Sequence, residues 1–435
     1  MQPQPALGIV ADDLTGANDT LVQFAEAGFN ARLSLAAGET STVATAPPSA
    51  TAYITDSRAL DAAAARSRTG EAVKNLSRAG INRLYVKIDS TMRGSIAGQV
   101  AGALDAWGET HSDPFAVVCP AYPAMGRVVD GGQLLVHGRP VESSPAGTDP
   151  VTPVHTSTMT RLLPGATSVP RLSEIPPEKR AQTLISAARE TAVVVVDAVT
   201  QSDLDVIATI LQEIGPRAVP VGSAGLAGAL AALSAVQGAD KPAAVQGPAA
   251  GRTLVVVSSL HDASHEQVRV LTDGTPRQEL LILQPSMENL RSAATAQAWL
   301  ETMLPLPSLS STVLMVSPPR ADAGEKEQLD GTSRGDAVAG GLAALTITLM
   351  ENYEFSNLVL IGGDGARAVL HACGAESVTV TGAIEEGVPL GVVNGGRVDG
   401  LRAVTKAGGF GEPETLVDIL KAITSHTPHP TEASS

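Results

Sequence analysis

The sequence has few cysteines, few aromatic residues, no basic run and no long apolar run. Its 435 residues include two cysteines, Cys119 and Cys373, whose wide separation offers neither a disulfide framework nor a thiolate metal site and fits a reducing compartment. No run reaches the roughly 18 apolar residues of a membrane span. The opening MQPQPALGIV lacks the basic and apolar regions of a signal peptide. We therefore expect a cytoplasmic protein with no membrane partner.

Positive charge is also scarce. There are 45 acidic against 30 basic side chains, giving a net charge of −15. A field of that sign repels nucleic acid, so we expect no nucleic-acid partner. A small anionic substrate is compatible with this charge only if basic side chains gather inside one pocket. Hydrophobic residues make up 43% of the chain and charged residues 17%, which is typical of a globular protein.

Short apolar runs recur along the chain and alternate with alanine-rich segments of helical length. Most of the runs are continuous rather than alternating, as expected of parallel strands that are covered on both faces. Examples are LGIV, LYVKI, FAVVC, TAVVVV, TLVVV, TVLMV and NLVLI. This order predicts an α/β protein of two domains with mainly parallel sheets.

A Pro-, Gly- and Ala-rich stretch at residues 234–252 predicts the domain boundary. We expect an N-terminal domain over residues 1–245 and a C-terminal domain over residues 252–420. The polar residues 421–435 predict a disordered tail. Within the first domain, residues 126–155 predict a hairpin flap, with two short strands joined at HGRP. The Gly-, Asp- and Ser-rich residues 321–341 predict a mobile loop.

Charged side chains follow three of the predicted strands of the N-terminal domain. In an open α/β sheet, ligands bind beyond the carboxyl ends of the strands. One such cluster is ordinary, because strand-to-helix loops need caps, but three in succession favour a shared polar pocket. The residues concerned are Asp12, Asp13, Asp56, Ser57, Arg58, Lys87, Asp89, Ser90 and Arg93.

The chemistry of these side chains suits a hydroxylated anion. Arg58, Lys87 and Arg93 are suited to clamp a carboxylate. Asp12 or Asp89 could accept hydrogen bonds from substrate hydroxyl groups, and one of them could remove a proton from an attacking hydroxyl. The structural alternative is that one aspartate of the pair 12–13 only caps the next helix and the other faces water.

Glycine-rich segments follow strands elsewhere, in VPVGSAGLAGALAAL, LVLIGGDGA and KAGGFG. Each alone is more often a tight turn than a phosphate site, but three in one chain favour a nucleotide. There is no Walker sequence and no GxGxxG. The spacing of His, Cys and carboxylate residues matches no zinc site. We expect His137, His261 and His265 to lie in solvent rather than on a ligand.

Several long motifs together resemble one family. IVADDLTGANDTLVQFAEAG, VKIDSTMRGSI, CPAYPAMGRVVDGGQLLVHGRPV, GSAGLA, IGGDGA and KAGGFG occur in this order. They resemble the four-carbon acid sugar kinase family over about residues 6–420. The resemblance implies a sugar-acid-binding N-terminal domain and a nucleotide-binding C-terminal domain. It also implies phosphorylation of the 4-hydroxyl of D-threonate, D-erythronate or a 3-oxo-tetronate. GANDT and TDPVTPV look more like the first two activities.

The resemblance also implies site residues. For the substrate they are Asp12, Arg58, Lys87, Ile88, Asp89, Ser90 and Arg93, with Asp12 and Asp89 as the candidate catalytic carboxylates. For the nucleotide they are Ser258, Gly362, Gly363, Asp364, Gly365 and Gly408. Two positions depart from the family pattern: Ser258 replaces a usual glycine, and Gly365 stands where a threonine commonly follows Asp364.

The leading hypothesis is therefore a kinase that uses ATP and Mg²⁺ to phosphorylate a four-carbon sugar acid, with D-threonate first. The sequence does not identify metal ligands and leaves a homo-oligomer open. Two alternatives remain. One is a nucleotide-dependent dehydrogenase, for which Glu385 and Glu386 fall near the expected distance from the glycine loop. The other is a non-catalytic sugar-acid sensor.

Overall fold

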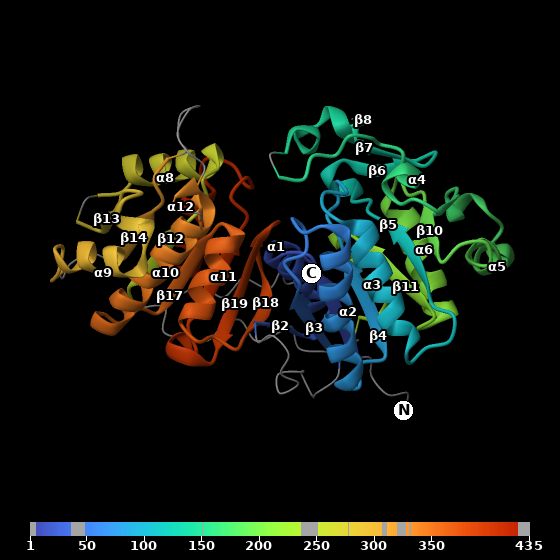
Figure 1. Cartoon of the computed structure of the whole chain (residues 1–435), viewed down its shortest axis with the longest axis horizontal. Coiled ribbons are helices and arrows are strands. Elements are labelled where there is room, and N and C mark those ends of the chain that lie inside the picture. Colours follow the sequence, from blue (N-terminus) through green and yellow to red (C-terminus); the bar gives the residue numbers. More distant parts are fainter. Residues whose placement is uncertain are drawn as a thin grey trace, which may run out of the picture. The chain divides into compact units, whose positions relative to one another are not determined.

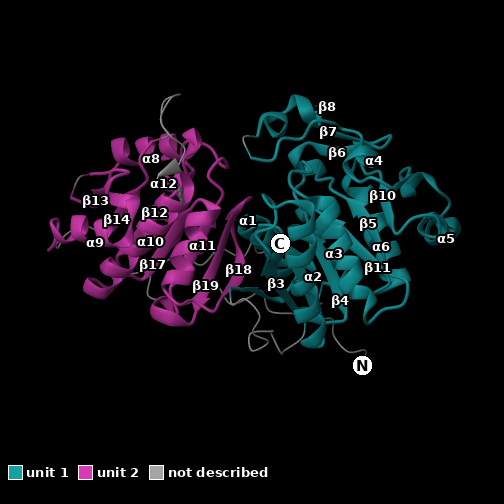
Figure 2. Cartoon of the chain, in the orientation of Figure 1, with its two compact units in different colours: residues 1–242 teal, residues 243–435 magenta. Residues whose placement is uncertain are grey.

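The structure is a computed structural model that describes residues 6–35, 48–149, 151–235, 251–276, 278–306, 311–319, 328–329 and 332–424. The chain forms two compact units, Met1–Pro242 and Ala243–Ser435 (Figure 2). Both units are α/β with mainly parallel sheets, so the predicted fold class is confirmed. Among the described residues, no helix combines the length and the apolar character needed to cross a membrane.

Unit 1 is built on a parallel sheet in the order β2-β3-β1-β4-β11-β5-β10-β9. Its strands are β1 (Ala6–Ala11), β2 (Asn30–Ser34), β3 (Ser49–Ile54), β4 (Arg83–Lys87), β5 (Phe115–Cys119), β9 (Thr167–Val169), β10 (Val193–Val196) and β11 (Ala218–Gly222). Its helices are α1 (Leu14–Glu26), α2 (Ala62–Arg78), α3 (Ile96–Gly108), α4 (Met159–Leu162), α5 (Pro177–Ala188), α6 (Gln201–Ile214) and α7 (Ala224–Leu233).

Helices α2 and α3 lie side by side, and two glycines make this possible (Figure 1). A Cβ atom on Gly98 would lie 2.4 Å from the carbonyl oxygen of Ala62, and one on Gly102 would lie 2.1 Å from that of Arg66. Any larger residue would therefore push the helices apart. Because α2 follows the loop after β3 and α3 follows the loop after β4, this close packing holds the two loops that carry Arg58 and Asp89.

A small antiparallel sheet forms the region predicted as a flap. It contains β6 (Arg127–Asp130), β7 (Gln133–Val136) and β8 (Arg139–Pro140). The predicted turn at HGRP is present, because His137-Gly138 joins β7 to β8. The region nevertheless has three strands rather than two, and a turn at Gly131-Gly132 joins β6 to β7. Both residues of the Gly131-Gly132 turn have positive φ, which glycine adopts without strain.

Unit 2 has the strand order β13-β14-β12-β17-β20-β19-β18, in which β19 is antiparallel to both of its neighbours. Its strands are β12 (Thr253–Val257), β13 (Leu280–Leu283), β14 (Thr312–Val316), β17 (Asn357–Ile361), β18 (Ser377–Glu385), β19 (Val388–Asn394) and β20 (Arg402–Lys406). Its helices are α8 (Asp262–Gly274), α9 (Ala293–Glu301), α10 (Arg334–Asn352), α11 (Gly363–Ala372) and α12 (Thr415–Thr424). The strands β15 (Gln328–Leu329) and β16 (Thr332–Ser333) form a separate antiparallel sheet of two strands.

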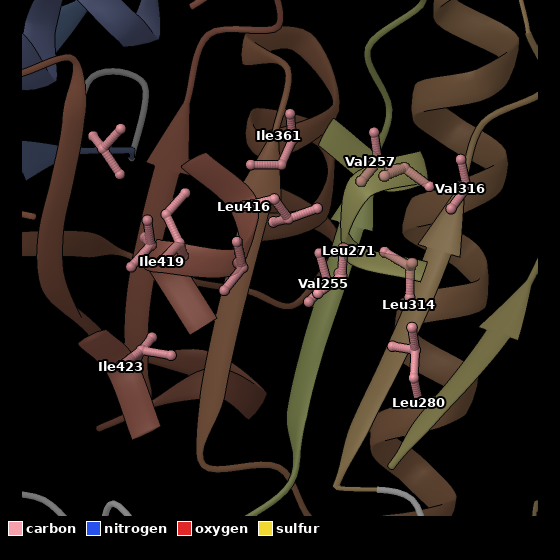
Figure 3. Packing of buried hydrophobic residues seen from close by; sticks show 14 residues of the cluster. Val255, Val257, Leu271, Leu280, Leu314, Val316, Ile361, Leu416, Ile419 and Ile423 are labelled. Carbon is pink, nitrogen blue, oxygen red and sulfur yellow. The ribbon is translucent and has the colours of Figure 1, made fainter. Parts of the chain in front are cut away.

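One apolar core holds the strands of unit 2 in register. Val255, Leu314 and Ile361 come from neighbouring strands, and Leu416 and Ile419 of α12 pack on them (Figure 3). All five side chains are at most 2% exposed. The continuous apolar runs of the sequence thus form strands that are covered by helices, as parallel sheets require.

Two boundaries differ from the predictions. Helix α10 begins at Arg334, so the last part of the expected mobile loop 321–341 is helical, with Asp336 N–H bonded to the capping side chain of Ser333. Helix α12 runs to Thr424, so residues 421–424 of the expected tail are also helical. Residues 425–435 lie outside the described residues, as does residue 245, the expected end of the first domain.

Candidate active site

The predicted substrate residues of unit 1 follow three strands that are neighbours in the sheet. Strand β1 pairs in parallel with β3 on one side and with β4 on the other. The loops after these strands carry Asp12, Arg58 and Asp89, respectively. Backbone hydrogen bonds tie the first two loops together, because Ser57 N–H donates to the carbonyl of Asp12 (3.2 Å). The parallel pairing of these three strands therefore brings together residues that are up to 77 positions apart in the sequence.

Arg58 and Asp12 form the central ion pair of this site. Arg58 Nε lies 2.8 Å from Asp12 Oδ2 and its Nη2 lies 2.9 Å from Oδ1, so the guanidinium binds both carboxylate oxygens. Arg58 Nη1 also donates to Asp13 Oδ2 at 2.9 Å. Asp12 is 2% exposed. A carboxylate buried this deeply requires such a partner.

Asp13 is the aspartate of the pair 12–13 that caps the next helix, as the structural alternative expected for one of them. It is the N-cap of α1, and its Oδ1 accepts the Gly16 N–H at 2.8 Å. Asp12 does not face water, so only half of the structural alternative holds.

Asp89 is held by its own loop. Its carboxylate accepts hydrogen bonds from Thr91 N–H, from Thr91 Oγ1 and from Arg93, whose Nη2 lies 2.7 Å from Oδ2. The other side of the Arg93 guanidinium reaches Asp149, with Nη1 to Oδ2 at 3.0 Å. Asp149 lies in the TDPVTPV segment and caps the turn that follows it by accepting from Thr152 N–H. The segment therefore reaches the site through Arg93.

The remaining predicted substrate residues lie in the same loop. Lys87 is the last residue of β4 and is 5% exposed, and its Nζ donates to the Ile88 carbonyl at 2.9 Å. A Cβ atom on Gly16 would lie 2.7 Å from this Nζ, so glycine there makes room for the ammonium at the start of α1. The Ile88 side chain is fully buried, which leaves only its backbone for a ligand. Ser90 is partly exposed.

The two candidate bases differ in their pKa values. Burial raises the pKa of Asp12; Arg58 opposes this shift and Asp13 adds to it. Burial alone would also raise the pKa of Asp89, but the charges of Arg58 and Arg93 and the hydrogen bonds outweigh it and hold that pKa far below its usual range. Asp12 is therefore the more basic carboxylate of the two.

The predicted nucleotide residues follow three neighbouring parallel strands of unit 2. The order β12-β17-β20 places Ser258, the segment 362–365 and Gly408 at one edge of the sheet. Gly362 N–H donates to the carbonyl of Lys406 at 2.8 Å, and Ser258 Oγ donates to that of Ile361 at 3.0 Å. Gly363 and Asp364 open α11, whose N-cap is Gly362. The predicted residues are thus brought together.

Close approach explains the glycines of these loops. A Cβ atom on Gly365 would lie 2.0 Å from Ser258 Oγ, and one on Gly408 would lie 1.9 Å from Ser259 Oγ. Gly362 has a φ of 107°, which side chains rarely adopt. The backbone of both loops is therefore packed against the serines that follow β12.

The third glycine-rich segment belongs elsewhere. Gly222 is the last residue of β11 and Ser223 follows it, so this segment belongs to unit 1, whereas the other two glycine-rich segments belong to unit 2. Ser223 caps α7 by accepting from Gly225 N–H, and its Oγ donates to the Ala121 carbonyl. Among the predicted solvent histidines, His261 caps α8 through Nδ1, which accepts from Ala263 N–H. His265 is only partly exposed and His137 lies at the β7–β8 turn.

Comparison with known proteins identifies both units. The profile of the sugar-binding N-terminal domain matches residues 7–230, and that of the nucleotide-binding C-terminal domain matches residues 254–416. The chain is 39% identical to D-threonate kinase from Bordetella bronchiseptica over 96% of its own length and 98% of that protein. The chain belongs to the four-carbon acid sugar kinase family.

A second relative supports this assignment, and a solved structure supports the fold. D-threonate kinase from Salmonella typhimurium is 30% identical over 95% of the chain and 97% of that protein. A solved structure from Salmonella typhimurium, described as a putative tRNA synthase, superposes with a TM-score of 0.75 at 22% identity, covering 95% of this chain and 98% of that one. At that identity the superposition supports the fold alone. The predicted assignment to a family of kinases is confirmed.

Proposed function

We propose that this chain transfers the terminal phosphate of ATP to the 4-hydroxyl of D-threonate, giving 4-phospho-D-threonate and ADP. The full-length similarity to D-threonate kinases carries the choice of substrate. D-Erythronate and 3-oxo-tetronates, the substrates of sister family members, are the alternatives. Unit 1 binds the sugar acid and unit 2 binds the nucleotide.

The basic side chains of unit 1 recognise the sugar-acid carboxylate. A guanidinium has five N–H bonds, and three of those of Arg58 donate to Asp12 and Asp13. The other two, together with Arg93 and Lys87, provide charge-assisted donors for a carboxylate. The N–H of Ile88 donates to the Gly222 carbonyl, and its own carbonyl keeps a second lone pair beside the bond from Lys87. This carbonyl and the hydroxyl of Ser90, in the same loop, bind substrate hydroxyl groups.

Asp12 is the base of choice. It orients the 4-hydroxyl and accepts its proton as the oxygen attacks the γ-phosphorus and ADP leaves. A carboxylate has about four lone-pair positions, so Asp12 can accept a hydroxyl while it binds Arg58. Asp89 has so low a pKa that it is a weak proton acceptor; it holds Arg93 in place instead.

The nucleotide phosphates bind the loops after β12, β17 and β20, where Ser258, Gly362, Gly363, Asp364, Gly365 and Gly408 lie. The described residues contain no group of three His, Cys, Asp or Glu side chains that could hold a metal ion. This suits Mg²⁺, which keeps several waters and is commonly held through substrate phosphates. We propose that Mg²⁺ enters with ATP as part of the substrate complex and neutralises charge on the transferred phosphoryl group.

Product analysis tests the position and direction of transfer. Full-length protein incubated with Mg-ATP and D-threonate should give one new phosphomonoester signal in ³¹P NMR, coupled to the protons on C4. A phosphate on O2 or O3 would contradict the proposed orientation. Thermal-shift measurements with ATP, with NAD and with D-threonate separate the other two functions, because each ligand stabilises by its own mass action. A dehydrogenase would respond to NAD, and a sensor to the acid alone.

A further inference from the structure

Lys406 is a buried cation that the function described above does not use. It ends β20 and is 2% exposed. Its Nζ donates to the carbonyl oxygens of Ala407 (2.8 Å) and Phe410 (2.7 Å). Its own carbonyl accepts the Gly362 N–H at 2.8 Å. Lys406 therefore contacts both glycine loops of unit 2, one through its side chain and the other through its backbone.

Two side chains of α8 bind the same loop in the same way. Ser264 Oγ donates to the Gly408 carbonyl at 2.7 Å. Gln267 Nε2 donates to the carbonyls of Phe410 and Glu412, both at 3.0 Å. Both side chains are 1% exposed. The carbonyl groups of residues 407, 408, 410 and 412 are thus drawn towards the interior of the unit.

The direction of these carbonyls fixes the direction of the neighbouring amides. In a trans peptide the N–H points opposite to the C=O of the preceding residue. The N–H groups of Gly408, Gly409 and Gly411 therefore point away from Lys406, Ser264 and Gln267. Within the described part of the chain, none of these three amides donates to a protein acceptor. The intervening Phe410 N–H donates to the Ala407 carbonyl. Three outward amides of one loop beside a buried positive charge form a binding place for an anion.

We propose that Lys406 is a positioning residue for the nucleotide: it holds the loop 407–411 with its amides turned towards the phosphates and places a positive charge beneath them. This inference rests on the proposed function of unit 2 and deepens it. Ser264 and Gln267 support the same loop with neutral donors. The ammonium has three N–H donors, and Ala407 and Phe410 account for two of them.

Burial lowers the pKa of Lys406 to about 8, and the charge of Glu385 opposes this shift. Glu385 also accepts a hydrogen bond from Thr415 Oγ1 at 2.8 Å, which fixes it near the start of α12. The cation is therefore retained at neutral pH but is less stable than a lysine in water. A bound polyphosphate would stabilise its charged form, which is the expected behaviour of a cation that serves an anionic ligand.

The test compares Lys406→Met, which keeps an unbranched side chain shorter by one atom and removes its charge and donors, with wild type. Calorimetry on the full chain gives the Kd of Mg-ATP, and a separate titration gives that of D-threonate. We expect Mg-ATP to bind about 10- to 100-fold more weakly and D-threonate to change less than twofold. Lys421→Met is the matched control, because Lys421 is a surface lysine of α12 (side chain 72% exposed); both affinities should stay at wild-type values.

Two further variants separate positioning from a general structural role. Lys406→Arg restores a cation and should recover Mg-ATP affinity to within about fivefold of wild type. Gln267→Met removes a neutral support and should weaken Mg-ATP binding by about threefold. The proposal is overturned if Lys406→Met binds Mg-ATP within twofold of wild type, or if it loses affinity for both ligands by the same factor. Because binding is measured without turnover, a wild type that binds Mg-ATP but phosphorylates no acid would refute the kinase function and not the role of Lys406.

Discussion

The hydroxymethyl group of Ser258 occupies the space that a side chain at Gly365 would need. A Cβ atom at position 365 would lie 2.0 Å from Ser258 Oγ and 2.2 Å from Ser258 Cβ. From the sequence resemblance, we expect glycine at position 258 and threonine at position 365, where this chain has serine and glycine. The departures fit each other, because the side chain gained at 258 fills the space vacated at 365.

This relationship predicts a strong coupling between the two positions. Gly365→Thr alone should displace the loop at the start of α11, costing about 1–3 kcal/mol of overpacking, and should raise the KM for Mg-ATP roughly 5- to 150-fold. The double variant Ser258→Gly/Gly365→Thr should bind Mg-ATP within about threefold of wild type. A double-mutant cycle on Mg-ATP affinity measures the coupling. Additive effects of the two substitutions would contradict the steric explanation.

Arg58→Ala should weaken sugar-acid binding far more than ATP binding. The substitution removes a donor to the substrate carboxylate, worth about 1.5–3 kcal/mol, or roughly 10- to 150-fold in affinity. It also leaves the buried Asp12 without its bidentate partner, so the melting temperature should fall. Arg66→Ala is the control, because Arg66 pairs with Asp105 at the surface, where the two side chains are 57% and 56% exposed. Equal losses for the acid and for ATP would refute the assignment of Arg58 to the sugar acid.

Asp12→Asn should lower turnover while leaving ATP affinity unchanged. Asparagine keeps the shape of the side chain but cannot accept the hydroxyl proton, and general-base catalysis contributes typically 10²- to 10⁴-fold. Steady-state kinetics with D-threonate should therefore show a large fall in kcat at a nearly constant KM for ATP. Full turnover in this variant would exclude Asp12 as the base and make Asp89 the next candidate.

Acid should destabilise the protein partly through Asp89. Its folded-state pKa lies far below the unfolded value of about 3.9, because the charges of Arg58 and Arg93 outweigh the effect of burial. Such a group stabilises the fold above the unfolded pKa, and this contribution is lost as the pH falls from about 5. The difference in unfolding free energy between wild type and Asp89→Asn, from urea titrations at pH 7, 5, 4 and 3, should narrow towards low pH. A difference that stays constant would contradict this assignment, and Asp105→Asn serves as the surface control.

Much of the fold and of the candidate site could be predicted from the sequence, because buried parallel strands have a recognisable pattern of apolar residues. Continuous apolar runs such as TLVVV and NLVLI form strands that are buried on both faces. The polar residues that follow such runs must lie at one edge of the sheet, so the predicted substrate residues could be grouped in unit 1 and most of the nucleotide residues in unit 2. The resemblance of the long motifs to one family then indicated which reaction these residues serve.

Partnerships between distant residues could not be predicted in this way. Asp149 reaches Arg93 from 56 positions along the chain, and its place depends on the irregular path of the segment after β8. The TDPVTPV motif indicated that this segment matters for the substrate, but it does not identify Arg93 as the partner of Asp149. Gly222-Ser223 has the local pattern of a nucleotide loop although it precedes the predicted domain boundary, and the strand order confirms that it belongs to unit 1. Such pairings are set by tertiary packing.

ADP release in a coupled assay tests the central claim most directly. Full-length protein with Mg-ATP is presented with D- and L-threonate, D- and L-erythronate and 3-oxo-tetronates. We predict ADP release that depends on the acid, with the highest kcat/KM for D-threonate. Absence of ADP release with every four-carbon acid would contradict the account.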